Sequence, residues 1–282
     1  MVFSDYHVHT AFSPDSQASM EDMVLKGIEL GLTEMAFTDH VDIDSPGDDF
    51  ITMDSYNHYY PVFKALQAKY AERITLILGI ENGYQPQVTK KMEAILNEVP
   101  FDFALMSVHT VDHKRCHDPE YQEGVTEATA TIRYLETILQ AVTEFRNYDS
   151  LAHLTFLARY LKSKSLSYSG YKEYFNEIFS LLIAGGKALE VNTSGYRYGL
   201  SAPIPDWELL KSYYKAGGRF ITMGSDAHIT TDLARDFDIV QQGLAAIGFK
   251  TISTFRCREM ILQPLIGQPR KTAAGLSRRI SG

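Results

Sequence analysis

The chain has 282 residues, of which 45% are hydrophobic and 22% charged, the balance of a globular protein with one large or two small domains. Its net charge of −8 at pH 7 argues against broad binding to nucleic acids or anionic membranes, which usually relies on excess lysine and arginine. Two cysteines make no disulfide framework, and we find neither a secretory signal nor an apolar run of about 18 residues. We therefore expect a cytoplasmic protein that does not span a membrane.

Short β-rich segments alternate with helical stretches along most of the chain. The predicted strands cover residues 2–9, 34–40, 74–82, 101–109, 150–154, 187–195 and 219–228. The predicted helices cover residues 20–30, 56–69, 88–97, 126–145, 168–184 and 207–216. This alternation indicates a parallel α/β sheet, as either a barrel or an open doubly wound sheet. No G-x-G-x-x-G or P-loop pattern follows a strand, so we favour a seven-stranded (β/α)7 TIM-like barrel.

The alternation ends after residue 228. Residues 249–257 and 259–262 both read as extended segments that could pair at the edge of the domain. No Pro- or Gly-rich linker divides the chain, so we expect one domain over residues 1–265. Residues 266–282 carry four basic side chains and little apolar content, and we expect a flexible tail there.

Most of the histidines lie where a predicted strand ends. The strand-end set also contains two carboxylates, and its members are His7, His9, His40, Glu81, His109, His153, Asp226 and His228. Residues i and i+2 of a strand share a face, so His7 and His9 converge on one spot. In a parallel barrel the C-terminal ends of all strands face one rim, where we expect the whole set to meet. His58 and His117 fall outside this pattern, and His113 is expected at the rim.

This combination of side chains predicts a site for several metal ions. Imidazole suits Zn, Fe and Mn, and added carboxylates favour the harder of these metals. Six histidines, two carboxylates and a further candidate, Asp15, exceed what one ion accepts, so we expect two or three ions sharing a bridging carboxylate. By composition alone Asp15 could equally be a turn residue in S-P-D-S. Such sites activate water and clamp phosphoryl oxygens, which favours phosphoester hydrolysis.

The motifs resemble those of the polymerase and histidinol phosphatase (PHP) superfamily. They are DYHVHT with FSPDS, TDH at 38–40, GIE at 79–81, SVH at 107–109, His153 and GSDAH at 224–228. LEVNTSGYR at 189–197 and GFKTISTFRCREMILQPL near the end look like its histidinol-phosphate phosphatase branch. The resemblance implies a distorted barrel and three divalent metal ions, with Zn, Fe or Mn as the metal.

The resemblance also implies a role for each matching residue. One ion would be held by His7, His9, Glu81 and Asp226, the second by Glu81, His109 and His153, and the third by Asp15, His40 and His228. Glu81 would bridge the first two ions. Some relatives have another residue type at the position of Asp15.

The activity implied is hydrolysis of L-histidinol phosphate, a small phosphate monoester, to L-histidinol and phosphate in histidine biosynthesis. A metal-bridging hydroxide would attack phosphorus, with Asp226 and His228 as catalytic residues. His228 or a metal-bound water could pass the proton to the leaving group. Arg197 is the best candidate for phosphate binding, followed by Arg159 and Arg115, although each could be a solvated surface arginine. Asp5 and Asp39 are expected to support ligating imidazoles, although Asp5 could also be a buried cap.

Three other functions compete with this interpretation. A PHP phosphoesterase for nucleotides or phosphotyrosine is the nearest, although the negative net charge argues against a polynucleotide substrate. A metal-binding module without catalysis would lack some ligands, yet every position that the resemblance expects is filled. An amidohydrolase typically has a later lysine at a strand end, and no lysine ends a predicted strand here.

Overall fold

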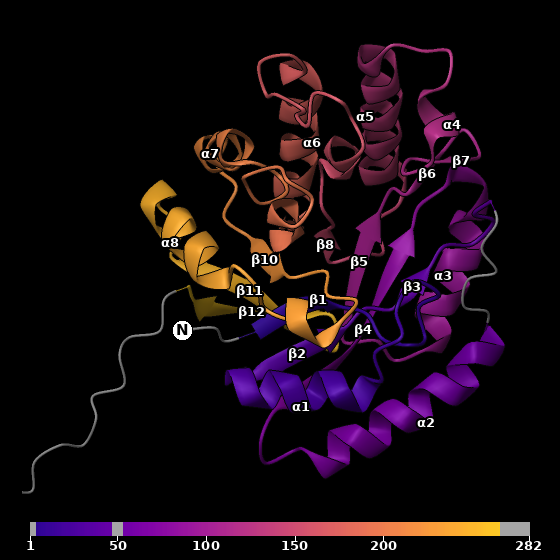
Figure 1. The fold of residues 1–282 in the computed structure, drawn as a ribbon, viewed down its shortest axis with the longest axis vertical. Coiled ribbons are helices and arrows are strands. Elements are labelled where there is room, and N and C mark those ends of the chain that lie inside the picture. The colour runs from indigo at the N-terminus through magenta and orange to yellow at the C-terminus, as the bar shows by residue number, and fades with distance from the viewer. Residues whose placement is uncertain (1–3, 47–52, 266–282) are drawn as a thin grey trace, which may run out of the picture.

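The computed structural model describes residues 4–46 and 53–265, without the side chains of residues 53–56. The first two residues of the predicted strand 2–9 and the predicted tail 266–282 lie outside this description. A parallel sheet runs through the molecule (Figure 1). Its strands follow the chain order: β1 (Ser4–Val8), β2 (Glu34–Phe37), β4 (Thr75–Gly83), β5 (Phe103–Ser107), β8 (Ser150–Leu151), β9 (Ala188–Asn192) and β10 (Ile221–Gly224). These are the seven predicted strands.

The sheet curls until its last strand meets its first. The N–H of Asp226 donates to the carbonyl of His7 at 2.8 Å, and the N–H of His9 donates to that of Ala227 at 2.9 Å. These bonds lie just past β10, so the barrel is nearly closed at its C-terminal end. The predicted TIM-like barrel is therefore confirmed, and the alternative of an open doubly wound sheet is wrong.

A β-bulge in β1 determines which of its side chains enter the barrel. Asp5 pairs with Met35 on β2, but the next pair is Val8 with Phe37, so β1 has one additional residue between them. Tyr6 consequently packs in the barrel interior, while His7 also turns inward and contacts Glu81. Without the bulge, strict alternation would place these two neighbours on opposite faces.

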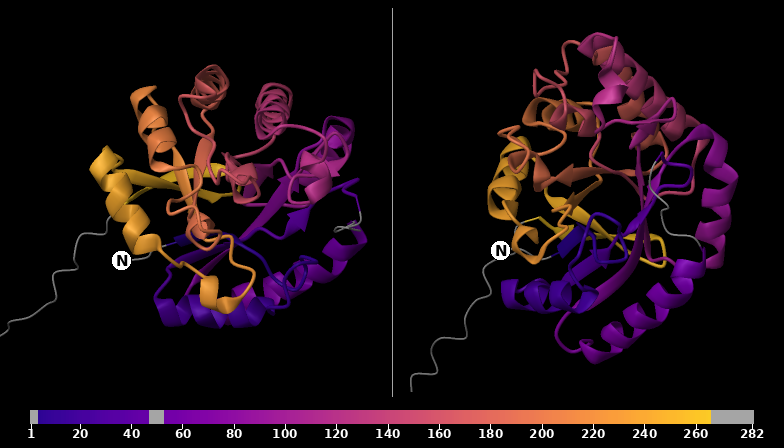
Figure 2. Two further views of the ribbon diagram at one scale, coloured as in Figure 1. Left: turned by 45° about the horizontal axis from the view of Figure 1, so that its top comes forward. Right: turned by 45° about the vertical axis from the view of Figure 1, so that its right-hand side comes forward.

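Helices cover the outside of the barrel (Figure 2). They are α1 (Met20–Leu30), α2 (Met53–Lys69), α3 (Thr89–Glu98), α4 (Pro119–Gln122), α5 (Glu127–Glu144), α6 (Lys172–Ala184), α7 (Trp207–Lys215) and α8 (Phe237–Ile247). The expected helix 168–184 starts later because residues 168–170 form a turn, in which Ser167 accepts the N–H of Gly170 at 3.3 Å. The prediction lacks α4 and α8. In α8, Gly243 leaves space for the ring of Trp207, which a Cβ would approach to 2.2 Å.

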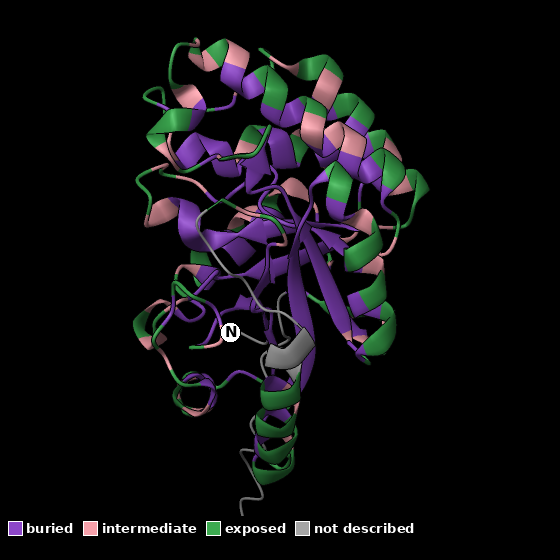
Figure 3. Ribbon diagram, turned by 90° about the vertical axis from the view of Figure 1, so that its right-hand side faces the viewer, coloured by how far each residue is buried: buried purple, intermediate pink, exposed green. Residues whose placement is uncertain are grey.

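The apolar core has an outer and an inner part. The outer part lies between the strands and the helices, which are buried on their inner faces and exposed outside (Figure 3). The inner part fills the N-terminal half of the barrel and consists of Tyr6, Ala36, Ile77, Phe103, Leu105, Ala152 and Phe255. No helix in the described part of the chain is both long and apolar enough to cross a membrane.

A C-terminal hairpin closes the N-terminal end of the barrel. Strands β11 (Thr251–Arg256) and β12 (Glu259–Pro264) pair antiparallel, as predicted. The ring of Phe255 lies 5.0 Å from that of Phe103, and the N–H of Phe255 donates to the hydroxyl of Tyr6 at 2.8 Å. Arg256 forms an ion pair of 2.5 Å with Glu34. The hairpin thus leaves the opposite rim as the open end of the barrel.

Several short elements lie at that open rim. They are β3 (His40–Val41), which pairs in parallel with the end of β4, the hairpin of β6 (Thr110–Val111) and β7 (Lys114–Arg115), and the 3-10 turns η1 (Pro86–Val88), η2 (Phe156–Arg159), η3 (Thr193–Tyr196) and η4 (Thr230–Asp232).

Candidate metal centre

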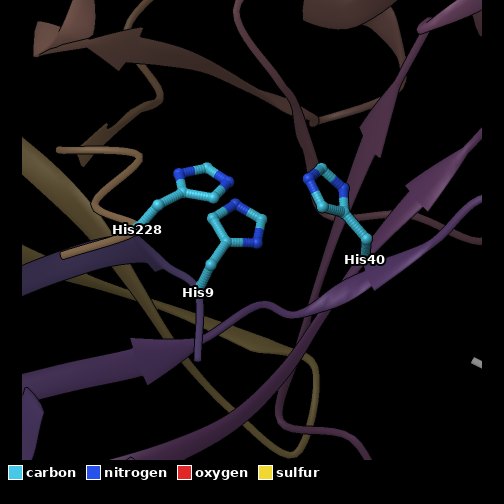
Figure 4. Close-up of side chains that lie close together, drawn as sticks. All are labelled: His9, His40 and His228. Carbon is cyan, nitrogen blue, oxygen red and sulfur yellow. The ribbon is translucent and has the colours of Figure 1, made fainter. Parts of the chain in front are cut away.

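The expected ligands come together at the C-terminal rim of the barrel. Figure 4 shows three of them, with the rings of His9 and His228 stacked beside each other and His40 facing them. The ring centroid of His9 lies 4.1 Å from that of His228 and 4.3 Å from that of His40. Three separate segments of the chain, which follow β1, β2 and β10, therefore supply imidazoles to one space.

The first group of donors surrounds one oxygen of Glu81. The Nε2 atoms of His7 and His9 lie 3.0 Å apart, and they are 3.1 and 3.4 Å from Oε2 of Glu81. Oδ1 of Asp226 is 3.6 Å from the first of these nitrogens and 3.4 Å from the second. Two imidazole nitrogens and two carboxylate oxygens thus converge from β1, β4 and the end of β10.

The second group surrounds the other oxygen of the same glutamate. Oε1 of Glu81 lies 2.8 Å from Nε2 of His153 and 3.3 Å from Nε2 of His109, and these two nitrogens are 3.4 Å apart. Glu81 is only 1% exposed and faces one donor group with each oxygen. Its position is compatible with a bridging carboxylate.

The third group lies nearest to solvent. Oδ2 of Asp15 is 3.0 Å from Nε2 of His228 and 3.6 Å from Nε2 of His40. Asp15 belongs to the turn after β1, and its side chain is 54% exposed. His40 pairs in register with Glu81 across β3 and β4, which places it between this group and the other two.

The electrostatics of the cluster favour ionised carboxylates among crowded imidazoles. Burial opposes ionisation of Glu81, but His7 and His40 hold its pKa well below the usual range. Burial likewise opposes ionisation of Asp226, whose pKa is held well below the usual range by Arg159 and His7. Burial and the neighbouring imidazoles of His228 and His40 lower the pKa of His9. Against the effect of burial, the adjacent carboxylates instead raise the pKa of His7 and His40, so these imidazoles share protons with carboxylates that bound metal ions would displace.

Two carboxylates outside the expected ligand set also contact the imidazoles, and one of them, Asp42, lines the cavity and forms a possible donor group with His40 and His109. Nδ1 of His7 lies 2.6 Å from Oε1 of Glu190, and Nδ1 of His109 lies 3.1 Å from both oxygens of Asp42. Glu190 is in the middle of β9 rather than at its end, which is why a search of strand ends misses it. A charged residue within the apolar run ALEVN is the signal that could have identified it.

The expectation that Asp5 and Asp39 bond directly to ligating imidazoles is wrong, and the contacts of Asp5 agree instead with the alternative of a buried cap. Asp39 accepts the N–H of Thr10 at 2.6 Å and the hydroxyl of Ser13 at 2.7 Å, so it holds the loop after β1. Asp5 accepts the N–H groups of Ser225 at 2.9 Å and of Ala234 at 3.0 Å, and it holds the segment after β10. Both carboxylates satisfy backbone and hydroxyl donors next to the site, and Asp39 reaches an imidazole through Ser13, whose Oγ lies 3.1 Å from Nδ1 of His9.

A cavity of about 270 Å³ opens beside the cluster. Its lining combines His40, His109, His153, Asp226 and His228 of the cluster with Arg115, Arg159, Phe156, Tyr160 and Tyr198. His117 also lines the cavity although it does not end a strand, whereas His113 is exposed in the turn between β6 and β7. The combination of metal-binding groups, arginine and aromatic rings suits a small anionic ligand with a flat or apolar part.

The predicted arginines have different environments. Arg159 is buried between the rings of Phe156 and Tyr198, and its Nη2 donates to Oδ2 of Asp226 at 2.6 Å. Arg115 lines the cavity and pairs with Asp118 at 2.7 Å. Arg197, the first choice from the sequence, is not part of this cavity lining.

The guanidinium of Arg197 is engaged by the protein itself. It donates to the carbonyls of Ser225 and Asp226 at 2.8 Å each and pairs with Asp232 at 3.2 Å. Arg197 therefore holds the backbone that carries Asp226.

Known proteins resemble this chain over most of its length. A histidinol-phosphatase of Lactococcus lactis is 32% identical over 257 residues, which cover 89% of this chain and 93% of that protein. The crystal structure of histidinol phosphate phosphatase from this organism, complexed with Zn, L-histidinol and phosphate, has a TM-score of 0.86 at 30% identity. It covers 92% of this chain and 98% of its own.

A second solved structure has the same fold at lower identity. The structure, of a protein from Listeria monocytogenes, has a TM-score of 0.75 at 22% identity. The match covers 84% of the present chain and 99% of the Listeria chain. The PHP domain family matches residues 5–194, which include the strands from β1 to β9. Because this match spans more than half of the sequence, the chain belongs to the PHP domain family.

Proposed function

We propose that this protein is a metal-dependent phosphomonoesterase that hydrolyses L-histidinol phosphate to L-histidinol and phosphate in histidine biosynthesis. The observation that carries the proposal is the similarity, over nearly the full length of both chains, to a Lactococcus lactis structure that holds Zn, L-histidinol and phosphate. The cavity beside the donor cluster supports it, because its size and its arginines suit a small phosphate ester.

The three donor groups would hold three divalent ions. His7, His9, Glu81 and Asp226 would hold the first, Glu81, His109 and His153 the second, and Asp15, His40 and His228 the third. The donors fit such ions because imidazole nitrogens and carboxylate oxygens converge at 2.8–3.6 Å from one another. Zn is favoured over Fe and Mn by the number of imidazoles and by the Zn in the Lactococcus structure.

Bound divalent ions would supply an activated water and would neutralise the charge on the phosphate oxygens. The residues of the chain orient the substrate and move the proton. His228 lies on the open side of the cluster with its side chain 27% exposed, but it could donate to the leaving alkoxide only while its Nε2 does not hold the third ion, so a water would be the donor when all three ions are bound. Asp226 would help to hold the first ion, and its Oδ2 accepts a hydrogen bond from the guanidinium of Arg159.

Arg159 and Arg115 would bind the phosphate, since both line the cavity. Arg197 would act on the substrate only through the backbone that it holds at Ser225 and Asp226. The aromatic wall of Phe156, Tyr160 and Tyr198 would contact the imidazole end of the substrate.

The test is phosphate release by chelated protein to which single metals are added back. L-histidinol phosphate is compared with p-nitrophenyl phosphate, a mononucleotide and phosphotyrosine. We expect kcat/KM for L-histidinol phosphate to exceed that of each other ester by at least about tenfold, which corresponds to about 1.4 kcal/mol of specific binding in the transition state. Equal values would show a phosphoesterase of another or broader specificity, and no release with any metal would contradict the enzymatic assignment.

A further inference from the structure

Strand β9 brings no expected metal ligand to the rim, yet it places a carboxylate directly behind the cluster. Glu190 lies in the middle of this strand and is only 1% exposed. No lysine or arginine within the described residues forms an ion pair with it. A buried carboxylate is costly unless its oxygens are hydrogen-bonded, so its partners indicate what it does.

Each oxygen of Glu190 serves a different donor group of the cluster. Oε1 lies 2.6 Å from Nδ1 of His7, and Oε2 accepts the backbone N–H of His153 at 2.7 Å. The side-chain amide of Asn192 also donates to Oε2, at 3.1 Å. With Oε1 as the acceptor, Nδ1 of His7 donates this hydrogen bond, which leaves Nε2 as the nitrogen that can bind an ion on the side of Glu81 and Asp226.

The neighbouring strand is shaped to admit this contact. Gly224, which ends β10, faces Glu190 and His7, and a Cβ there would lie 2.4 Å from Oε1 of Glu190 and 2.4 Å from Cβ of His7. Real Cβ atoms do not approach other atoms so closely, so any side chain at this position would push the pair apart. The first residue of GSDAH is therefore glycine because the His7–Glu190 pair occupies its side-chain space.

We propose that Glu190 is a positioning residue that aims His7 and His153, and so determines the metal affinity of the first two donor groups together. The proposal rests on the metal centre of the proposed function and concerns a residue outside its ligand set. A carboxylate behind a ligating imidazole sets its tautomer and orientation, and loss of such a partner typically costs about 10- to 100-fold in metal affinity. Because Glu190 serves two groups, its loss is expected to weaken two ions at once.

Two variants test the positioning role from opposite sides. Glu190→Gln keeps the shape of the side chain but lets only one of its two polar atoms accept a hydrogen bond. Gly224→Ala keeps the carboxylate and displaces it from His7. Thr222→Val is the matched control: Thr222 is buried on β10, pairs in register with Glu190, and bonds Ser150 at 2.8 Å without contacting a donor of the cluster.

The measurement is zinc affinity by competition with a chromophoric chelator, together with the visible absorption spectrum of the Co²⁺-loaded protein. We expect Glu190→Gln and Gly224→Ala each to bind two of the ions about 10- to 100-fold more weakly and to alter the Co²⁺ bands, while Thr222→Val resembles wild type. Circular dichroism confirms folding, and if Glu190→Gln does not fold, Gly224→Ala decides. Wild-type affinity and spectrum in a folded variant would overturn the positioning role, whereas absence of metal binding by wild type would instead overturn the proposed function.

Discussion

Replacing Glu81 by glutamine is the most direct perturbation of the proposed metal centre. The change keeps the volume of a side chain that is 1% exposed, but it removes one negative charge. Oε1 faces His153 and His109 at 2.8 and 3.3 Å, and Oε2 faces His7 at 3.1 Å. In either orientation of the amide, its NH₂ group points at imidazole nitrogens whose lone pairs a metal needs.

The expected loss of metal affinity follows from the contacts of both oxygens of the Glu81 carboxylate. Loss of a hydrogen-bond partner behind one ligand typically costs about 10- to 100-fold in metal affinity, and loss of a direct ligand should cost at least as much. Because Glu81 faces two donor groups, the combined loss for the two ions is expected to reach about 100- to 10,000-fold. Phosphatase activity should then fall below detection at zinc concentrations that saturate wild type.

Zinc content after dialysis and phosphate release from L-histidinol phosphate measure the two effects. Glu34→Gln is the matched control, since Glu34 is a buried glutamate of the same barrel that pairs with Arg256 at the opposite end. It should lower stability and leave the ratio of zinc to protein unchanged. If folded Glu81→Gln retains both the zinc content and the activity of wild type, Glu81 does not bridge two ions.

Three further predictions test the C-terminal hairpin, the cavity arginine and the need for metal. Phe255→Ala should lower the free energy of unfolding by about 3–5 kcal/mol and Tm by about 5–8 °C in calorimetry, without changing the zinc content. An unchanged Tm would refute the role of the hairpin in closing the barrel. Arg159→Lys should reduce kcat/KM by about 10- to 100-fold, because the bond to Asp226 is lost, and wild-type kinetics would contradict this. Chelation should abolish activity and added zinc or manganese should restore it; activity that survives complete chelation would exclude metal catalysis.

Much of the barrel and most of the cluster were predictable because they follow from local patterns. A strand of alternating or apolar residues that ends in histidine or a carboxylate indicates both the element and its functional end. His7, His40, His109 and His153 are far apart in the chain, yet parallel strands bring their C-terminal ends to one rim. The topology of the fold therefore brings most of the metal donors together.

The remaining parts depend on contacts that no local pattern contains. The bulge between Asp5 and Val8 turns both Tyr6 and His7 inward, and only pairing with β2 reveals it. Arg197 and Arg159 each follow a strand. Arg197 donates to a carbonyl past β10, whereas Arg159 lines the cavity. Spacing along the chain does not distinguish these arginines, because the difference lies in their tertiary partners.

The two ends of the barrel explain why neutral packing and charged donors coexist in one interior. At the N-terminal end, Phe255 and Phe103 exclude water, and the polar groups that remain, such as Glu34, are paired with cations of the hairpin. At the rim, Glu81 and Glu190 have imidazole and amide partners but no arginine or lysine ion pair within the described residues. A buried carboxylate is costly without compensating charge, which His7 and His40 supply to Glu81 in this structure and which bound metal ions would supply in their place. Zinc should therefore raise the Tm of wild type more than the Tm of Glu81→Gln in calorimetry.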